Sequence, residues 1–111
     1  MERRVVITGL GVVSPVGTGV EKFWNSLLEG KSGIAPITRF DAADFPVKIA
    51  GEVKDFDPAL AGDKKTIRHM DRNAQFAVAA ARMAVEDAKL DMEKENPDRS
   101  EERRVGKECQ L

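Results

Sequence analysis

The chain has 111 residues, a formal net charge of −1, a hydrophobic content of 41% and an aromatic content of 5%. A charge near zero gives no overall attraction to nucleic acid or a membrane surface, and so few aromatics argue against a stacking platform for single-stranded nucleic acid. No signal-peptide pattern or apolar run of roughly 20 residues is evident. Cys109 is the single cysteine, which excludes an intramolecular disulfide. We therefore expect a cytoplasmic protein without nucleic-acid or membrane partners.

The first predicted element is a buried strand at residues 5–8, a β-branched run typical of sheets covered on both faces. Gly9 and Gly11 interrupt this strand, and Ser14-Pro15 predicts a turn. A dinucleotide-binding turn is an alternative interpretation. It fails because Ser14 stands where the third glycine of G-x-G-x-x-G belongs, and because no Gly-Lys-Ser/Thr phosphate loop follows.

An amphipathic helix comes next. Thr18 and Glu21 have the spacing of a capping box at its start, and Gly30 predicts its end. Five apolar residues recur at helical spacing on one face: Val20, Phe23, Trp24, Leu27 and Leu28.

The middle of the chain alternates loops and one strand. Residues 31–46 are expected to be a loop. Residues 47–53 alternate apolar and charged side chains, which predicts a half-exposed strand in a hairpin or at an edge. A turn region around Asp57-Pro58 occupies residues 55–63.

A second helix is predicted at residues 71–90. Its middle, residues 74–81, is apolar almost all round, which indicates core packing at the centre of a larger fold. Residues 91–107 are dominated by charged side chains and cannot bury enough surface to order themselves, so we expect a disordered or solvated tail.

The sequence offers few groups for catalysis. Cys109 lies in the charged tail with no histidine beside it, so an incidental thiol is the expected role. Ser14 lacks the Gly-x-Ser-x-Gly context of a hydrolase. His69 is the single histidine and has no partner at metal-ligand spacing. We predict no catalytic residue, no metal and no cofactor site within this chain.

A basic cluster precedes and enters the second helix, formed by Lys64, Lys65, Arg68, His69 and Arg72. Such a cluster is either a solvated helix entry or a docking patch for an acidic partner. Composition alone leaves both interpretations open.

Several motifs then occur in the order found at the start of the β-ketoacyl-[acyl-carrier-protein] synthase II family of ketosynthases. They are residues 3–11, residues 14–17, Phe23-Trp24, Leu27-Leu28, residues 30–34, Phe40-Asp41, residues 50–56 and residues 70–72. The chain resembles this family over residues 3–90. Ordered motifs over that length are much more specific than a single glycine turn.

The resemblance implies a thiolase-like α/β fold, with a mixed sheet between helix layers in each of two similar halves. This chain would form only part of the first half, residues 1–90. It also implies a homodimer that condenses acyl groups with malonyl-acyl carrier protein, with loss of CO₂. The family's cysteine and two histidines lie beyond the matched region, so the chain itself is expected to be inactive.

The family docks acyl carrier protein through basic residues at this place, and Lys65 and Arg68 match them, with Lys64 adjacent. The chain departs from the family after Asp98-Arg99, where residues 100–109 resemble translated adapter sequence. We interpret residues 91–111 as a charged, disordered and non-native tail. Two alternatives remain: a small binding module that recognises an acidic protein through the basic patch, and a fragment of a polyketide-type ketosynthase.

Overall fold

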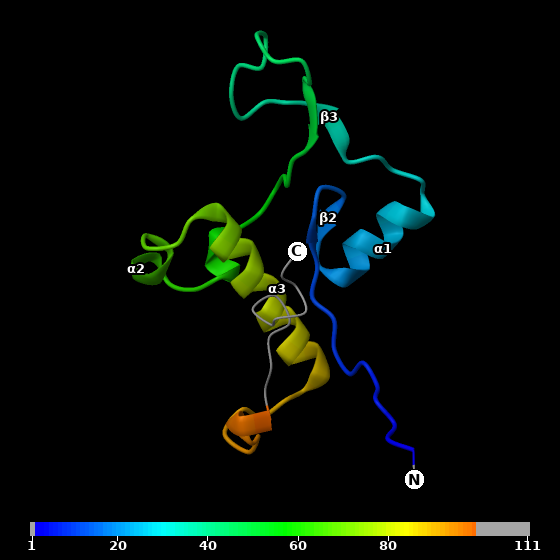
Figure 1. The fold of residues 1–111 in the computed structure, drawn as a ribbon, viewed down its shortest axis with the longest axis vertical. Coiled ribbons are helices and arrows are strands. Elements are labelled where there is room, and N and C mark those ends of the chain that lie inside the picture. The colour runs from blue at the N-terminus through cyan, green and yellow to red at the C-terminus, as the bar shows by residue number, and fades with distance from the viewer. Residues whose placement is uncertain (1, 100–111) are drawn as a thin grey trace.

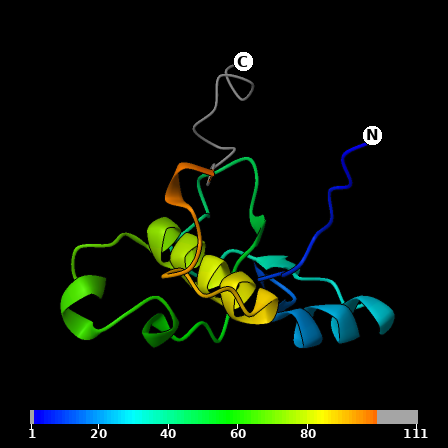
Figure 2. The same cartoon turned by 90° about the horizontal axis from the view of Figure 1, so that it is seen from below.

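A computed structural model describes residues 2–99. The described chain has two small antiparallel sheets and one long helix, with shorter helices beside that helix and one of the hairpins projecting away from it (Figures 1 and 2). The elements are β1 (Val13–Ser14), β2 (Gly17–Thr18), α1 (Val20–Leu28), β3 (Ile34–Pro36), β4 (Ile49–Gly51), η1 (Pro58–Leu60), α2 (Lys64–Ile67), α3 (Arg72–Ala88) and η2 (Pro97–Arg99). The radius of gyration is 17.3 Å, against about 13 Å for a compact domain of 100 residues. The arrangement is therefore open, with α1 and α2 on opposite sides of α3.

The predicted buried strand at residues 5–8 is not a strand in this structure. Residues 2–12 are extended but carry no strand assignment, and Val5 and Ile7 are 90% and 84% exposed. A β-branched run favours extended backbone, but a strand also needs a neighbour to accept its hydrogen bonds. Within residues 2–99 the sheets pair only β1 with β2 and β3 with β4, so that neighbour is missing.

Gly9 and Gly11 allow the extended segment to approach α3 closely. A Cβ on Gly9 would collide with the carbonyl of Ala84, and one on Gly11 with the carbonyl of Ala80. The backbone N–H of Leu10 also donates a 3.0 Å hydrogen bond to Asp87 on α3. These glycines therefore let the extended segment pack on α3, because only hydrogen fits between the two backbones.

The turn predicted at Ser14-Pro15 is confirmed as the turn of the β1–β2 hairpin, where Ser14 pairs with Gly17. The predicted capping box is wrong. Thr18 pairs with Val13 in the hairpin, so the helix begins one residue later, after Gly19 with φ 93°, without a side-chain cap. Thr18 Oγ1 is buried and has no hydrogen-bond partner in the described residues.

Helix α1 ends as the sequence predicts. Gly30 has φ 68°, and the N–H groups of Gly30 and Lys31 donate to the carbonyls of Leu27 and Ser26 at 3.1 and 3.0 Å. This Schellman motif needs a left-handed residue, which glycine supplies without strain. The apolar face of α1 is largely uncovered, since Trp24 is 57% and Leu28 67% exposed.

The half-exposed strand expected within residues 47–53 is confirmed as β4. It pairs with β3, in the register Ile34 with Gly51 and Pro36 with Ile49. The prediction of an uninterrupted loop over residues 31–46 is therefore wrong. Strand β3 has three residues and ends in proline, so it carries none of the alternation that marks a strand.

The long helix predicted at residues 71–90 is confirmed as α3. Asp71 Oδ1 accepts a 2.9 Å hydrogen bond from the Ala74 N–H, and Lys89 ends the helix in the left-handed region with φ 55°. Ala79 is 1% exposed, whereas Ala77 and Ala81 are exposed. The described chain therefore covers only part of this apolar helix.

The charged tail is described only in part. Residues 91–99 contain a turn and η2, whereas residues 100–111, including Cys109, lie outside the described residues. The prediction of a disordered tail, and the division of the chain at residue 90, stay predictions.

Candidate docking surface

Three consecutive helical segments, each with an aspartate cap, build the corner that carries the basic cluster. Asp57 Oδ1 accepts from the Ala59 N–H at 3.0 Å and starts η1. Asp63 Oδ1 accepts from the Thr66 N–H at 2.8 Å and starts α2. Asp71 caps α3 in the same way. Because each carboxylate satisfies a backbone N–H that the helix leaves unpaired, residues 57–74 are specified mainly by local sequence.

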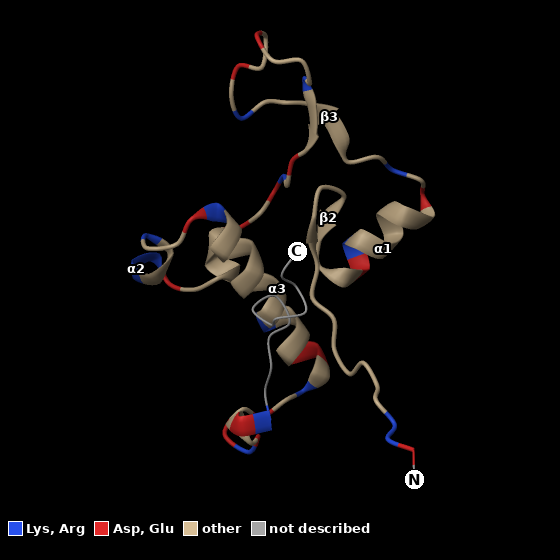
Figure 3. Cartoon of the chain, in the orientation of Figure 1, with Lys and Arg blue, Asp and Glu red and all other residues tan. Residues whose placement is uncertain are grey.

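The side chains of Lys64, Lys65 and Arg68 are exposed on α2 and at its end. Figure 3 shows α2 as a largely basic segment standing off the side of α3. In the described part of the chain, the ion pairs that form are Lys31 with Glu29 and Lys94 with Asp91, and neither involves this cluster. The positive charges therefore face solvent, where they are available to an acidic surface.

Asp63 is the acidic group at the start of this cluster. Hydrogen bonds from the Thr66 side chain and Thr66 N–H, helped by the Lys65 N–H, hold the pKa of the Asp63 carboxyl below its ordinary value, against a smaller opposing effect of desolvation. The carboxylate is therefore ionised at neutral pH.

Arg72, predicted as part of the basic cluster, makes contacts within the fold instead. Its Nη2 donates a 2.9 Å hydrogen bond to the carbonyl of Val53. Its guanidinium lies 4.8 Å from the ring centroid of Phe76 and 5.9 Å from that of Phe56, and these two rings meet edge to face. Arg72 thus joins the end of the β3–β4 hairpin to α3, a role that the sequence pattern did not reveal.

His69 follows Arg68 at the end of α2 and is exposed. Its backbone N–H donates to the Thr66 carbonyl at 3.1 Å. No group of three His, Cys, Asp or Glu side chains in residues 2–99 is arranged to hold a metal ion. In the same residues, no helix is long and apolar enough to cross a membrane.

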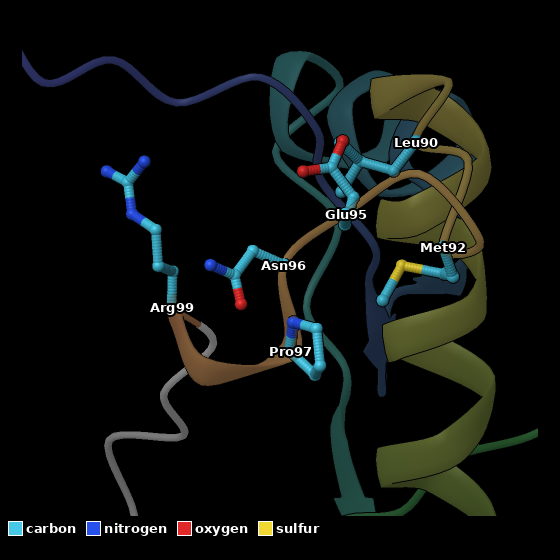
Figure 4. A pocket seen from close by; sticks show the side chains of 6 residues that line it. All are labelled: Leu90, Met92, Glu95, Asn96, Pro97 and Arg99. Carbon is cyan, nitrogen blue, oxygen red and sulfur yellow. The ribbon is translucent and has the colours of Figure 1, made fainter.

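A pocket of about 450 Å³ lies in the turn after α3 (Figure 4). It is lined by Leu90, Met92, Glu95, Asn96, Pro97 and Arg99. The lining offers no nucleophile and no histidine, and it shares no residue with the α2 cluster. The pocket is therefore separate from the cluster on α2.

The α/β arrangement and the motifs now define a class. A family model described as "Beta-ketoacyl synthase, N-terminal domain" matches residues 2–107, so the chain belongs to the β-ketoacyl synthase family. This confirms the family and the thiolase-like fold class expected from the sequence, of which the described residues form a partial α/β piece.

Particular relatives are similar over most of the chain. The "3-oxoacyl-[acyl-carrier-protein] synthase 2" of Coxiella burnetii is 58% identical over 98 residues, 88% of this chain and 24% of the relative. The protein of that name from Synechocystis sp. is 47% identical over 97 residues, 87% of this chain and 23% of the relative. A solved structure, "The ishigamide ketosynthase/chain length factor", matches with a TM-score of 0.74 at 49% identity, covering 84% of this chain and 23% of that chain. The chain thus spans about a quarter of the length of its curated relatives.

Proposed function

We propose that this chain is the N-terminal part of a 3-oxoacyl-[acyl-carrier-protein] synthase of fatty acid chain elongation. The observation that carries the proposal is the 58% identity to the Coxiella burnetii synthase over 88% of the chain. The whole enzyme would be a cytoplasmic homodimer that transfers an acyl group to a cysteine and condenses it with decarboxylated malonyl-carrier protein. The chain itself would be inactive, because neither His69 nor Cys109 matches a catalytic motif.

Within that enzyme, Lys64, Lys65 and Arg68 would dock acyl carrier protein. Three features support this role: the side chains are exposed, they have no ion-pair partner in residues 2–99, and they lie on a helical turn that Asp63 caps. A compact positive patch raises the association rate of an acidic partner and fixes its orientation.

A chimera tests the proposal. Residues 3–99 of this chain replace the matching segment of the Coxiella burnetii synthase, and the purified chimera is assayed for ketoacyl product from acyl- and malonyl-carrier protein. We expect product from the chimera and none from the 111-residue chain. An inactive but folded chimera, or activity of the chain alone, would contradict the proposal.

A second candidate is a ketosynthase of polyketide type. The match to the ishigamide ketosynthase/chain length factor favours it, since its 49% identity is similar to that of the Synechocystis relative. Rescue of growth by the full-length parent enzyme, in a strain that lacks its own synthase 2, separates the candidates, because only the fatty acid enzyme restores elongation of the cell's fatty acids. A free-standing binding module is a third candidate, and cooperative unfolding of the 111-residue chain would favour it.

A further inference from the structure

We propose that Asp63 is a positioning residue for the α2 cluster, with two opposing effects on an acidic partner. Its carboxylate fixes the first turn of α2, and its negative charge weakens the attraction of Lys64, Lys65 and Arg68 for that partner. The inference rests on the proposed docking function.

The positioning effect follows because α2 has little other stabilisation. The helix has four residues, and none of them is buried. Helices this short are unstable on their own, because one turn costs more conformational entropy than its hydrogen bonds return. Two bonds from Asp63 close the turn: Oδ1 accepts from Thr66 N–H at 2.8 Å, and the backbone carbonyl accepts from Ile67 N–H at 3.0 Å. Loss of the side-chain bond would let the turn open.

The second effect follows from the position of the charge. Asp63 directly precedes Lys64 and Lys65 and is exposed like them. An ionised carboxylate beside exposed ammonium groups lowers the local positive potential over a distance of about one Debye length. The caps at Asp57 and Asp71 begin the neighbouring segments, so Asp63 is the cap that belongs to the basic segment itself.

Two substitutions separate the effects. Asp63→Asn keeps a side-chain oxygen that caps as well as aspartate does, but it removes the charge. We expect the dissociation constant for purified acyl carrier protein to fall by about two- to five-fold at low salt, and this gain to vanish at high salt. Asp63→Ala removes both the cap and the charge. We expect binding about two- to ten-fold weaker than that of the unsubstituted protein at high salt, where only the positioning effect remains.

The measurements are made on the 111-residue chain and repeated in the chimera, so that a poorly folded chain does not decide the outcome. Hydrogen exchange of the Thr66 amide reports the turn directly, and we expect it to be faster in Asp63→Ala but unchanged in Asp63→Asn. Asp41→Asn is the matched control. Asp41 Oδ1 accepts from the Ala43 N–H at 3.0 Å, on the β3–β4 loop that projects away from α2.

The charge effect and the positioning effect of Asp63 can each be excluded by a separate result. Equal affinity of Asp63→Asn and the unsubstituted protein at low salt would exclude the charge effect. Equal affinity and Thr66 exchange in the Asn and Ala variants would exclude the positioning effect. If Lys65→Glu with Arg68→Glu leaves carrier-protein binding unchanged, the docking function itself fails, which is a different result from failure at Asp63.

Discussion

Arg72 Nη2 donates a 2.9 Å hydrogen bond to the carbonyl oxygen of Val53, nineteen residues earlier in the chain. The bond joins the end of the β3–β4 hairpin to the first turn of α3, while the guanidinium lies against Phe76. A residue that sequence alone groups with the exposed cations therefore stabilises the tertiary structure. Its neighbours Lys65 and Arg68 remain exposed.

This difference predicts opposite outcomes for two similar substitutions. Arg72→Met in the chimera removes a charge-assisted hydrogen bond and a cation–π contact, which should cost about 2 kcal/mol of stability. Lys65→Met should change stability by less than about 0.5 kcal/mol, because Lys65 is exposed. Thermal unfolding of both variants is the measurement. Equal melting temperatures would show that the Arg72 contacts are not stabilising.

The docking proposal predicts that Lys65→Glu with Arg68→Glu weakens binding of acyl carrier protein without unfolding the chimera. Reversing two charges in a positive patch opposes an acidic partner, so we expect a loss of about ten-fold or more at low salt, shrinking as salt is added. Isothermal titration at two salt concentrations measures it. Lys22→Glu with Lys31→Glu, on and just after α1, makes the same charge change elsewhere, and an equal loss there would assign the effect to net charge alone.

The hydrogen bonds of the Glu52 carboxylate predict that the stability of the loop at Thr38 and Arg39 depends on pH. Desolvation alone would raise the pKa of its carboxyl, but the Thr38 hydroxyl, the N–H groups of Thr38 and Arg39 and the charge of Lys54 together hold that pKa below its ordinary value. Its stabilising effect is therefore complete above the ordinary pKa and is lost as pH falls through the lower folded pKa. We expect the Thr38 and Arg39 amides, bonded at 3.1 Å, to exchange faster once acidification has passed below the ordinary pKa of a glutamate carboxyl.

The matched variant for this prediction is Glu52→Gln, which has no charge to lose. Exchange at Thr38 and Arg39 in this variant should be faster at neutral pH and should show no additional acid-induced step. Relative exchange rates, corrected for the intrinsic effect of pH, make the comparison. An identical acid step in both proteins would assign it to another group.

The close approach of Gly11 to α3 predicts that no larger residue is tolerated at this position. Alanine there would collide with the carbonyl of Ala80 and the backbone N of Ala84, so Gly11→Ala should cost about 1–3 kcal/mol through overpacking. Gly30 has φ 68° with open space around it, and asparagine tolerates that conformation, so Gly30→Asn should cost under about 1 kcal/mol. Thermal unfolding of the chimera ranks the two, and the reverse order would contradict the close approach of residues 9–11 to α3.

The sequence predicted those elements whose signals are local. The end of α1 at Gly30 and the helix after Asp71 both follow from short backbone rules, and both are confirmed. The predicted start of α1 is wrong because Thr18, the expected cap, pairs with Val13 in the β1–β2 hairpin instead. Strand β3 was missed because three residues ending in proline carry no periodic pattern.

In the candidate site, too, local features were predictable from the sequence, and long-range contacts were not. Exposure of Lys64, Lys65 and Arg68 is what a charged helix entry predicts. The role of Arg72 depends on Val53 and Phe56, which lie far from it in sequence and close to it only after folding. The caps at Asp57 and Asp63 were detectable in principle, since each aspartate directly precedes a short helical segment.

The extended segment at residues 5–8 has a consequence for biosynthesis. In the longer enzyme that we propose, these residues leave the ribosome before the parts of the chain that follow residue 99, yet no strand within residues 2–99 pairs with them. At about 5–20 residues per second, several seconds pass before later parts of such a chain are made. During that time a β-branched stretch with open backbone edges can pair with other nascent chains. Its protection would then fall to chaperones at the tunnel exit, and the time for which it stays unpaired would limit the yield of the enzyme.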